Sequence, residues 1–166
     1  MTSDLERLTA LFRELGAPEP EGWARSQSEE GFNQLHRYLF LRQAWALIVS
    51  DSDHDWMDRE IENATKNPNA PFSGVGAALR SLLDSGANRQ DLTDVIRGKQ
   101  AELLFGLCYL LEDPALTEDA VQHVGWRLVE TDEVDQPTQR PITGLQESVL
   151  ETDPTGREMR PRGPAA

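Results

Sequence analysis

The sequence predicts an all-α fold, a compact single-domain bundle of about six helices. Two stretches of the 166-residue chain are nearly free of strongly polar side chains: residues 38–49, and residues 103–111, which read LLFGLCYLL. Before the second stretch, apolar residues recur at spacings of three, four and seven, which is a helical repeat and not the alternation of a strand. We therefore expect two central apolar helices, at about 28–49 and 91–113, that are buried and cover one another.

The N-terminal elements follow from capping residues and prolines. Residues 3–15 are expected to form an amphipathic helix with Ser3 as its cap and Glu6 as its capping-box partner. Residues 17–22 contain two prolines and are expected to be a stiff connection without regular helix. Trp23 follows, and we expect its ring to dock this connection onto the core.

Between the two central helices, the pattern predicts two shorter ones. They cover residues 54–66 and about 73–85, and two prolines within residues 67–71 separate them. Asn88 is the expected cap of the second central helix, and Pro114 ends it.

The C-terminal part is expected to hold one more full helix and then to become irregular. That helix begins after Thr117 and reaches about residue 131, with polar, turn-rich residues behind it. A last short helix covers residues 144–152, with Thr143 as its cap. Residues 1–153 are thus the predicted helical domain, and residues 154–166 form an Arg/Pro-rich, mobile tail.

Negative charge is concentrated in two segments of a chain whose net charge is −13. Residues 51–62 hold six acids against one arginine, and residues 112–135 hold eight against one. Such a surface repels phosphate backbones, so we expect no nucleic acid as a partner. It attracts a basic protein surface, although the same acids are also explained by solubility alone.

Cysteine content and hydropathy point to the cytoplasm. Cys108 is the only cysteine and lies within an apolar run, as a small buried side chain does, and a lone cysteine fits a reducing compartment. The N-terminus has neither the basic start nor the apolar stretch of a signal peptide. The longest apolar run is far shorter than the roughly 20 residues of a membrane-spanning helix, so no membrane association is expected.

One acidic stretch resembles a calcium-binding loop in its spacing. Counted from Asp51, carboxylates fall at positions 1, 3, 5 and 12, as in an EF-hand. Position 6, however, is Trp56 where the sharp turn needs glycine. An acidic helix N-terminus explains the same residues without a metal. The candidate metal ligands are Asp51, Asp53, Asp55 and Glu62.

The same acids also suggest a protein-binding surface. An aromatic ring within an acidic rim would anchor a basic partner while the carboxylates steer its approach. Trp56 is the candidate anchor, and the alternative is that it points inward from a short helix. The candidate partner-binding residues are Trp56, Asp58, Glu60, Asp132, Glu133 and Asp135.

Catalysis has little support in the sequence. The three histidines fall on different predicted helices, and no paired cysteines, phosphate loop or nucleophile motif is present. We therefore expect no catalytic residue and no cofactor, and a non-catalytic protein-binding module of the inhibitor, immunity or chaperone type. The alternatives are a protein, with or without enzymatic activity, that binds a divalent metal or small ligand at residues 51–62, and a homodimer built on surplus apolar surface.

Overall fold

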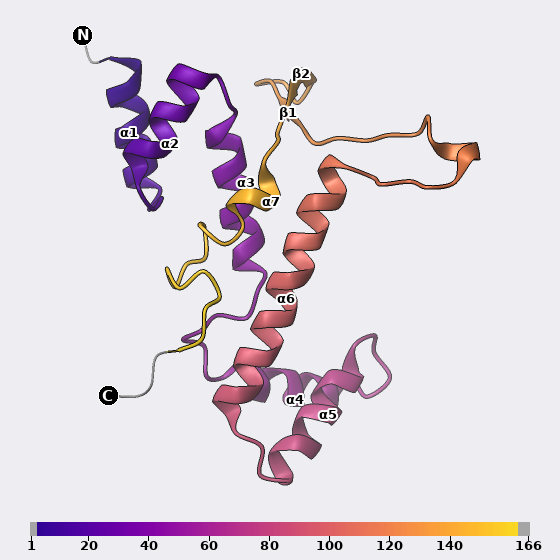
Figure 1. The fold of residues 1–166 in the computed structure, drawn as a ribbon. Coiled ribbons are helices and arrows are strands. Elements are labelled where there is room, and N and C mark those ends of the chain that lie inside the picture. The colour runs from indigo at the N-terminus through magenta and orange to yellow at the C-terminus, as the bar shows by residue number, and fades with distance from the viewer. Residues whose placement is uncertain (1–2, 163–166) are drawn as a thin grey trace. The chain divides into compact units, whose positions relative to one another are not determined.

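The computed structural model describes residues 3–162. Its described part is 56% helix, with seven α-helices and one small two-stranded hairpin, which confirms the all-α class (Figure 1). The chain divides into two compact units. Residues 46–101 form one, and the residues before and after them in the sequence form the other, which we call the outer unit. The expectation that residues 1–153 act as one domain stays a prediction.

The outer unit begins with the predicted capped helix. In α1 (Asp4–Glu14), the backbone N–H of Glu6 donates to Ser3 Oγ at 3.2 Å, and the N–H of Ser3 donates to the Glu6 carboxylate at 2.8 Å. This reciprocal pair satisfies two N–H groups that the first turn leaves without helical partners. The capping residues were therefore sufficient to predict where this helix begins.

The proline-rich connection contains a helix, contrary to the prediction. Helix α2 (Pro20–Arg25) starts at the second proline, because the N–H that proline lacks has no helical partner in the first turn. Trp23 in this helix is buried, and its ring lies 6.0 Å from that of Phe12 and 5.6 Å from that of Tyr38. The expected docking of Trp23 is therefore confirmed.

The first central helix is shorter than predicted. A π-helical turn, η1 (Ser26–Glu30), ends at Gly31, whose φ of +77° leaves the helical region. Helix α3 (Gln34–Ala46) begins three residues later. A residue in the left-handed conformation interrupts the backbone hydrogen bonds of a helix. The apolar residues recur at helical spacing on both sides of Gly31, so their pattern did not indicate that the helix stops there.

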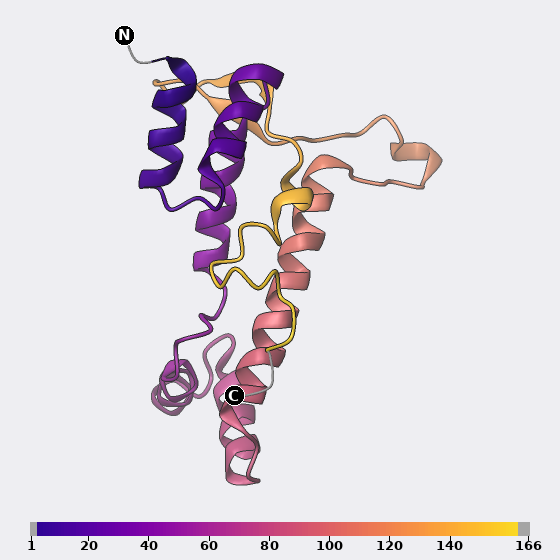
Figure 2. The same ribbon diagram turned by 60° about the vertical axis from the view of Figure 1, so that its left-hand side comes forward.

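The second central helix has nearly the predicted bounds. Helix α6 (Arg89–Glu112) is capped by Asn88, whose Oδ1 accepts from the N–H groups of Gln90 at 2.7 Å and Asp91 at 3.2 Å. Within the outer unit, however, α3 and the C-terminal part of α6 do not cover one another. Helix α7 (Leu145–Ser148) lies between them in both views (Figures 1 and 2).

Hydrogen bonds to both neighbours hold the α7 segment in place. From α3, Trp45 Nε1 donates to the carbonyl of Val149 at 3.0 Å and Arg37 Nε donates to that of Thr143 at 2.7 Å. From α6, the Glu112 carboxylate accepts the N–H groups that begin α7, those of Gly144 at 2.9 Å and Leu145 at 2.6 Å. Glu112 thus caps α7 in place of the predicted Thr143, because a carboxylate suits the positive end of a helix.

The apolar run 103–111 is not buried on all sides, and that prediction was wrong. Leu104 and Cys108 are buried, one helical turn apart on the side of α6 that also carries Glu112. The remaining large apolar side chains are 43% to 63% exposed, except Leu111, which is half-buried. One covering segment shields only one side of a helix, so the others face solvent.

The helix expected over residues 117–131 is absent from the structure. The chain makes only a 3₁₀ turn, η2 (Asp119–Val121), and then pairs β1 (Val129–Thr131) antiparallel with β2 (Pro137–Pro141). The Asp132 carboxylate closes the hairpin by accepting the N–H groups of Val134 and Gln136, both at 2.9 Å. Pairing with the neighbouring residues 137–141 therefore overrode a weak helical pattern.

The unit of residues 46–101 contains α4 (Trp56–Lys66), α5 (Ser73–Asp84) and the first part of α6. Both shorter helices begin and end close to their predicted bounds. They pack around Gly76, where a Cβ atom would lie 2.3 Å from the carbonyl oxygen of Glu60 and 2.6 Å from Cβ of Ala64. At Gly76 the two helices thus lie too close together for a side chain, a role that only glycine fills.

Polar side chains of α6 tie the segment before α4 to this unit. Val49 donates its N–H to Gln100 at 2.8 Å, and its carbonyl accepts from Arg97 at 2.8 Å. Trp56 Nε1 donates to Thr93 Oγ1 at 3.0 Å. These bonds satisfy groups in a small core whose buried members are Trp56, Met57 and Leu79.

The predicted tail is only partly described. Residues 153–156 form a turn, in which the N–H of Gly156 donates to the carbonyl of Asp153 at 2.9 Å. The Asp153 carboxylate also accepts from the N–H of Met159 at 3.1 Å, and residues 163–166 lie outside the described part. Within residues 3–162, no helix combines the length and apolar character needed to cross a membrane.

Candidate functional site

The acids of residues 51–62 are partly neutralised within the protein. Ion pairs join Asp53 to Arg59, Asp58 to Arg89 at 2.6 Å, and Glu62 to Lys66 at 2.5 Å. In each, the hydrogen bond from the basic partner is the main cause that lowers the pKa of the carboxyl group. The attraction that this segment exerts on a partner is correspondingly weaker than its sequence indicates.

The candidate metal ligands do not assemble. Asp53 is occupied by Arg59 and by the N–H of Asp55 at 3.0 Å, and Glu62 is occupied by Lys66. In the described part of the chain, no three His, Cys, Asp or Glu side chains are grouped so that they could hold a metal ion. The spacing of Asp51, Asp53, Asp55 and Glu62 in sequence is therefore not matched in space.

Trp56 does not lie on the surface as an anchor. Trp56 is 6% exposed, and its ring N–H donates to Thr93 Oγ1. The side chain therefore points inward, which was the alternative to the anchor role. Beside it, Asp58 is exposed but engaged with Arg89, and Glu60 is half-buried. The structure thus brings no aromatic ring to the acidic surface of this segment.

In the second acidic segment, the candidate residues lie at the tip of the hairpin. Asp132, Glu133 and Asp135 are exposed, but the Asp132 carboxylate is used by the turn. Glu130, on β1, is buried and lies 3.5 Å from His36 and 3.4 Å from Arg140. Glu133 and Asp135 are therefore the two members that project freely enough to meet a partner.

Helix α6 exposes apolar side chains that were predicted to lie in the core. Leu103, Leu107 and Leu110 stand at i, i+4 and i+7 on α6, turned away from the buried Leu104 and Cys108. They are 63%, 48% and 44% exposed. We call these three residues the α6 apolar face. Their spacing in the sequence shows that they share one side of a helix, but it does not show whether that side is buried or exposed.

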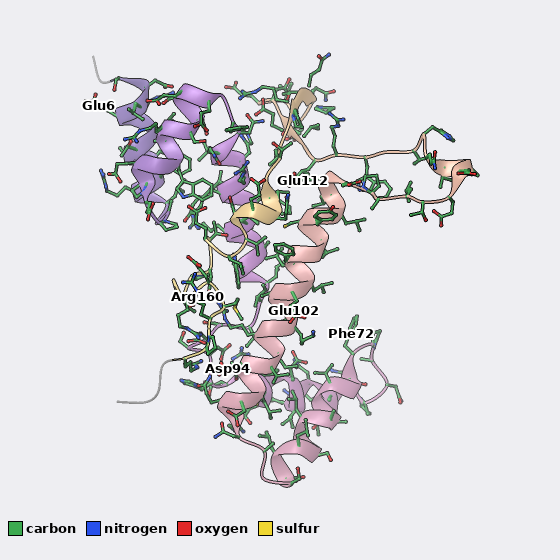
Figure 3. The ribbon with its side chains drawn as sticks, viewed as in Figure 1. Glu6, Phe72, Asp94, Glu102, Glu112 and Arg160 are labelled. Carbon is green, nitrogen blue, oxygen red and sulfur yellow. The ribbon has the colours of Figure 1, made fainter. Side chains whose placement is uncertain are left out.

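The surroundings of the α6 apolar face are acidic. Between Lys99 and Arg127 the chain has five acids and neither lysine nor arginine. Figure 3 shows Glu102 midway along α6 and Glu112 at its C-terminal end, beside α7. Asp113, Glu118 and Asp119, which follow the helix, are exposed. The chain that flanks the face in sequence therefore carries negative formal charge.

The α6 helix also carries the only cysteine, which is chemically shielded. Cys108 is fully buried, and burial is the main cause that raises the pKa of its thiol to about 11. Because the thiolate is the reactive form, we expect this thiol to react with a disulfide reagent at pH 8 at least about a hundredfold more slowly in the native protein than in urea. A time course of thiol labelling measures this; equal rates would contradict the burial.

Comparison of this chain with protein families, with characterised proteins and with solved structures found no match.

Proposed function

We propose that the chain is a non-catalytic binding module that holds a basic, amphipathic helical segment of a partner protein on the α6 apolar face. The observation that supports this most directly is the exposure of Leu103, Leu107 and Leu110 within a stretch that has no basic residue. Exposed apolar stripes at this spacing are the pattern by which helices recognise helical partners.

A basic partner fits better than a second copy of the chain. Two copies joined through this face would bring two acidic stretches together, and each copy has a net charge of −13. Like charges across an interface oppose association, whereas lysine or arginine flanking an apolar stripe would be attracted. The homodimer is therefore an outcome of the test below and not the proposal.

The remaining exposed acids contribute at longer range. Glu133 and Asp135 at the hairpin tip are exposed and add to the negative charge of the outer unit. Such charges raise the rate of encounter more than the lifetime of a complex, and salt screens them. We place this interaction in the cytoplasm, where a single buried cysteine meets a reducing environment.

The test uses three synthetic helical peptides with fluorescent labels. One has a leucine stripe flanked by lysines, the second has the same stripe flanked by glutamates, and the third has the composition of the first in scrambled order. We expect the basic amphipathic peptide to bind at least about tenfold more tightly than either other peptide, because it alone matches both stripe and charge. Fluorescence anisotropy gives the Kd values.

The variant Leu107→Gln is expected to weaken binding of the basic amphipathic peptide about tenfold, since it removes one apolar anchor from the interface. Leu107 is half-exposed, so the free energy of unfolding changes little. Leu47→Gln is the matched control, because Leu47 is 86% exposed and lies outside α6. Anisotropy titrations of both variants give the comparison.

Three results would overturn the proposal. They are equal loss of affinity in the two leucine variants, equal binding of all three peptides, and dimerisation of the free protein that Leu107→Gln abolishes, as sedimentation would show. Salt adds an independent readout: the association rate is expected to fall as ionic strength rises, while the effect of Leu107→Gln resides in the dissociation rate.

A further inference from the structure

A pocket with mainly apolar walls lies between α4 and α5, in the unit of residues 46–101. Its volume is about 300 Å³, near the lower end of the range for small-molecule sites. The apolar walls come from Ile61, Ala64 and Pro68 on one side and from Gly76 and Ala77 on the other. A space of this kind suits the apolar part of a small molecule.

The pocket also carries one positive charge, on Arg80. This side chain is exposed, and its Nη2 donates to Thr65 Oγ1 at 2.6 Å. Because Thr65 and Arg80 both line the pocket, this bond places the guanidinium at the pocket wall, where a ligand can reach it. The Thr65 hydroxyl in turn donates to the carbonyl of Ile61 at 2.6 Å, which fixes the position of the acceptor. The protein therefore holds the guanidinium in place before any ligand binds.

Arg80 has no acidic partner among residues 3–162. Neighbouring basic side chains differ, because Arg59, Lys66 and Arg89 each form an ion pair with an acid. Residues 63–83 contain two basic residues and no acid, in a chain whose net charge is −13. The bond to Thr65 uses only part of the planar fork of N–H donors that a guanidinium presents. The remaining donors of Arg80 are thus available to an anionic group.

We infer that this pocket binds a small organic carboxylate, with its carboxylate on Arg80 and its apolar body between α4 and α5. A guanidinium and a carboxylate are both planar and match through charge-assisted hydrogen bonds. An apolar body also removes the side chains of Ile61 and Ala77 from water, whereas an inorganic anion would use the charge alone. The inference concerns another surface than the α6 apolar face, so it does not depend on the proposed function.

The test follows the alanine methyl signals of the full chain by ¹H–¹³C NMR. Ala64 and Ala77 line the pocket, whereas Ala24 and Ala101 are buried and do not line it, so their signals are the reference. With phenylacetate as the probe, we expect the Ala64 and Ala77 signals to shift saturably, with a Kd below about 5 mM, while the reference signals stay in place. Phenylacetamide has the same body without the charge, and acetate has the charge without the body. Both are expected to bind at least about tenfold more weakly.

A matched pair of arginine variants separates binding at the pocket from general electrostatics. Arg80→Gln keeps a donor for Thr65 but removes the charge, and it is expected to weaken phenylacetate binding about tenfold while phenylacetamide binding stays unchanged. Arg89→Gln removes the same charge from the same unit, but Arg89 is paired with Asp58 and does not line the pocket, so phenylacetate binding should stay unchanged. Equal losses in the two variants, equal binding of phenylacetate and phenylacetamide, or no saturable shift with phenylacetate would each overturn the inference.

Discussion

Gly144→Ala is expected to lower the free energy of unfolding of the outer unit by about 4 kcal/mol, the sum of a backbone and a side-chain contribution. Gly144 has a φ of +71°, which disfavours any side chain. Its Cβ would also lie 2.1 Å from one terminal nitrogen of Arg37. The guanidinium is buried and bonded to Thr143, so it cannot move aside without leaving a buried charge uncompensated. Urea titrations followed by the labelling rate of Cys108 report on this unit.

Gly156→Ala is the matched control for that prediction. Gly156 has a similar φ of +67°, but nothing lies within 4 Å of the position its Cβ would take. Only the backbone contribution of about 1 kcal/mol is expected there. Equal losses in the two variants would mean that the contact of Arg37 with the start of α7 contributes nothing to stability.

Gly76→Ala is expected to destabilise residues 46–101 by about 2 to 3 kcal/mol through overpacking. The added methyl group would overlap the carbonyl oxygen of Glu60 and Cβ of Ala64, both parts of α4 that a rotamer change cannot move. Helices α4 and α5 must therefore separate, which exposes the core around Met57. Hydrogen exchange of residues 56–84, measured by mass spectrometry, is expected to quicken.

The control in the same unit has the opposite expected sign. Gly98 lies inside α6, and nothing lies within 4 Å of the position of its Cβ. Gly98→Ala should therefore stabilise the helix by about 0.5 to 1 kcal/mol, since alanine has the higher helix propensity. Destabilisation by both substitutions to a similar degree would show that close approach of α4 and α5 is not the cause.

Elements with signals inside their own sequence were predicted well. The capping box of Ser3 and Glu6, the cap at Asn88, and the bounds of α4, α5 and α6 depend on contacts within a few residues. Features that depend on pairing with another segment were missed. Residues 117–131 contain β1, which exists because residues 137–141 pair with it, and the short helix predicted at residues 144–152 is capped by Glu112, far earlier in the chain, and not by Thr143.

The candidate sites likewise combine features that the sequence shows with features that depend on the fold. Periodicity places Leu103, Leu107 and Leu110 on one stripe of a helix, but a stripe does not say whether another element covers it. The acids of residues 51–62 are a plain feature of the sequence, and the pair of Glu62 with Lys66 lies within one helix, but the pair of Asp58 with Arg89 joins residues far apart in the chain.

The sequence by itself determined that this chain is helical, where its capped helices begin, and that its charge is strongly negative, because propensity, capping and charge are properties of neighbouring residues. Tertiary structure alone decided which side of α6 is covered, that Asp58 is paired with Arg89, and that Trp56 points inward. Those outcomes depend on what each residue meets across the fold, and one sequence of apolar and polar residues is compatible with several such arrangements.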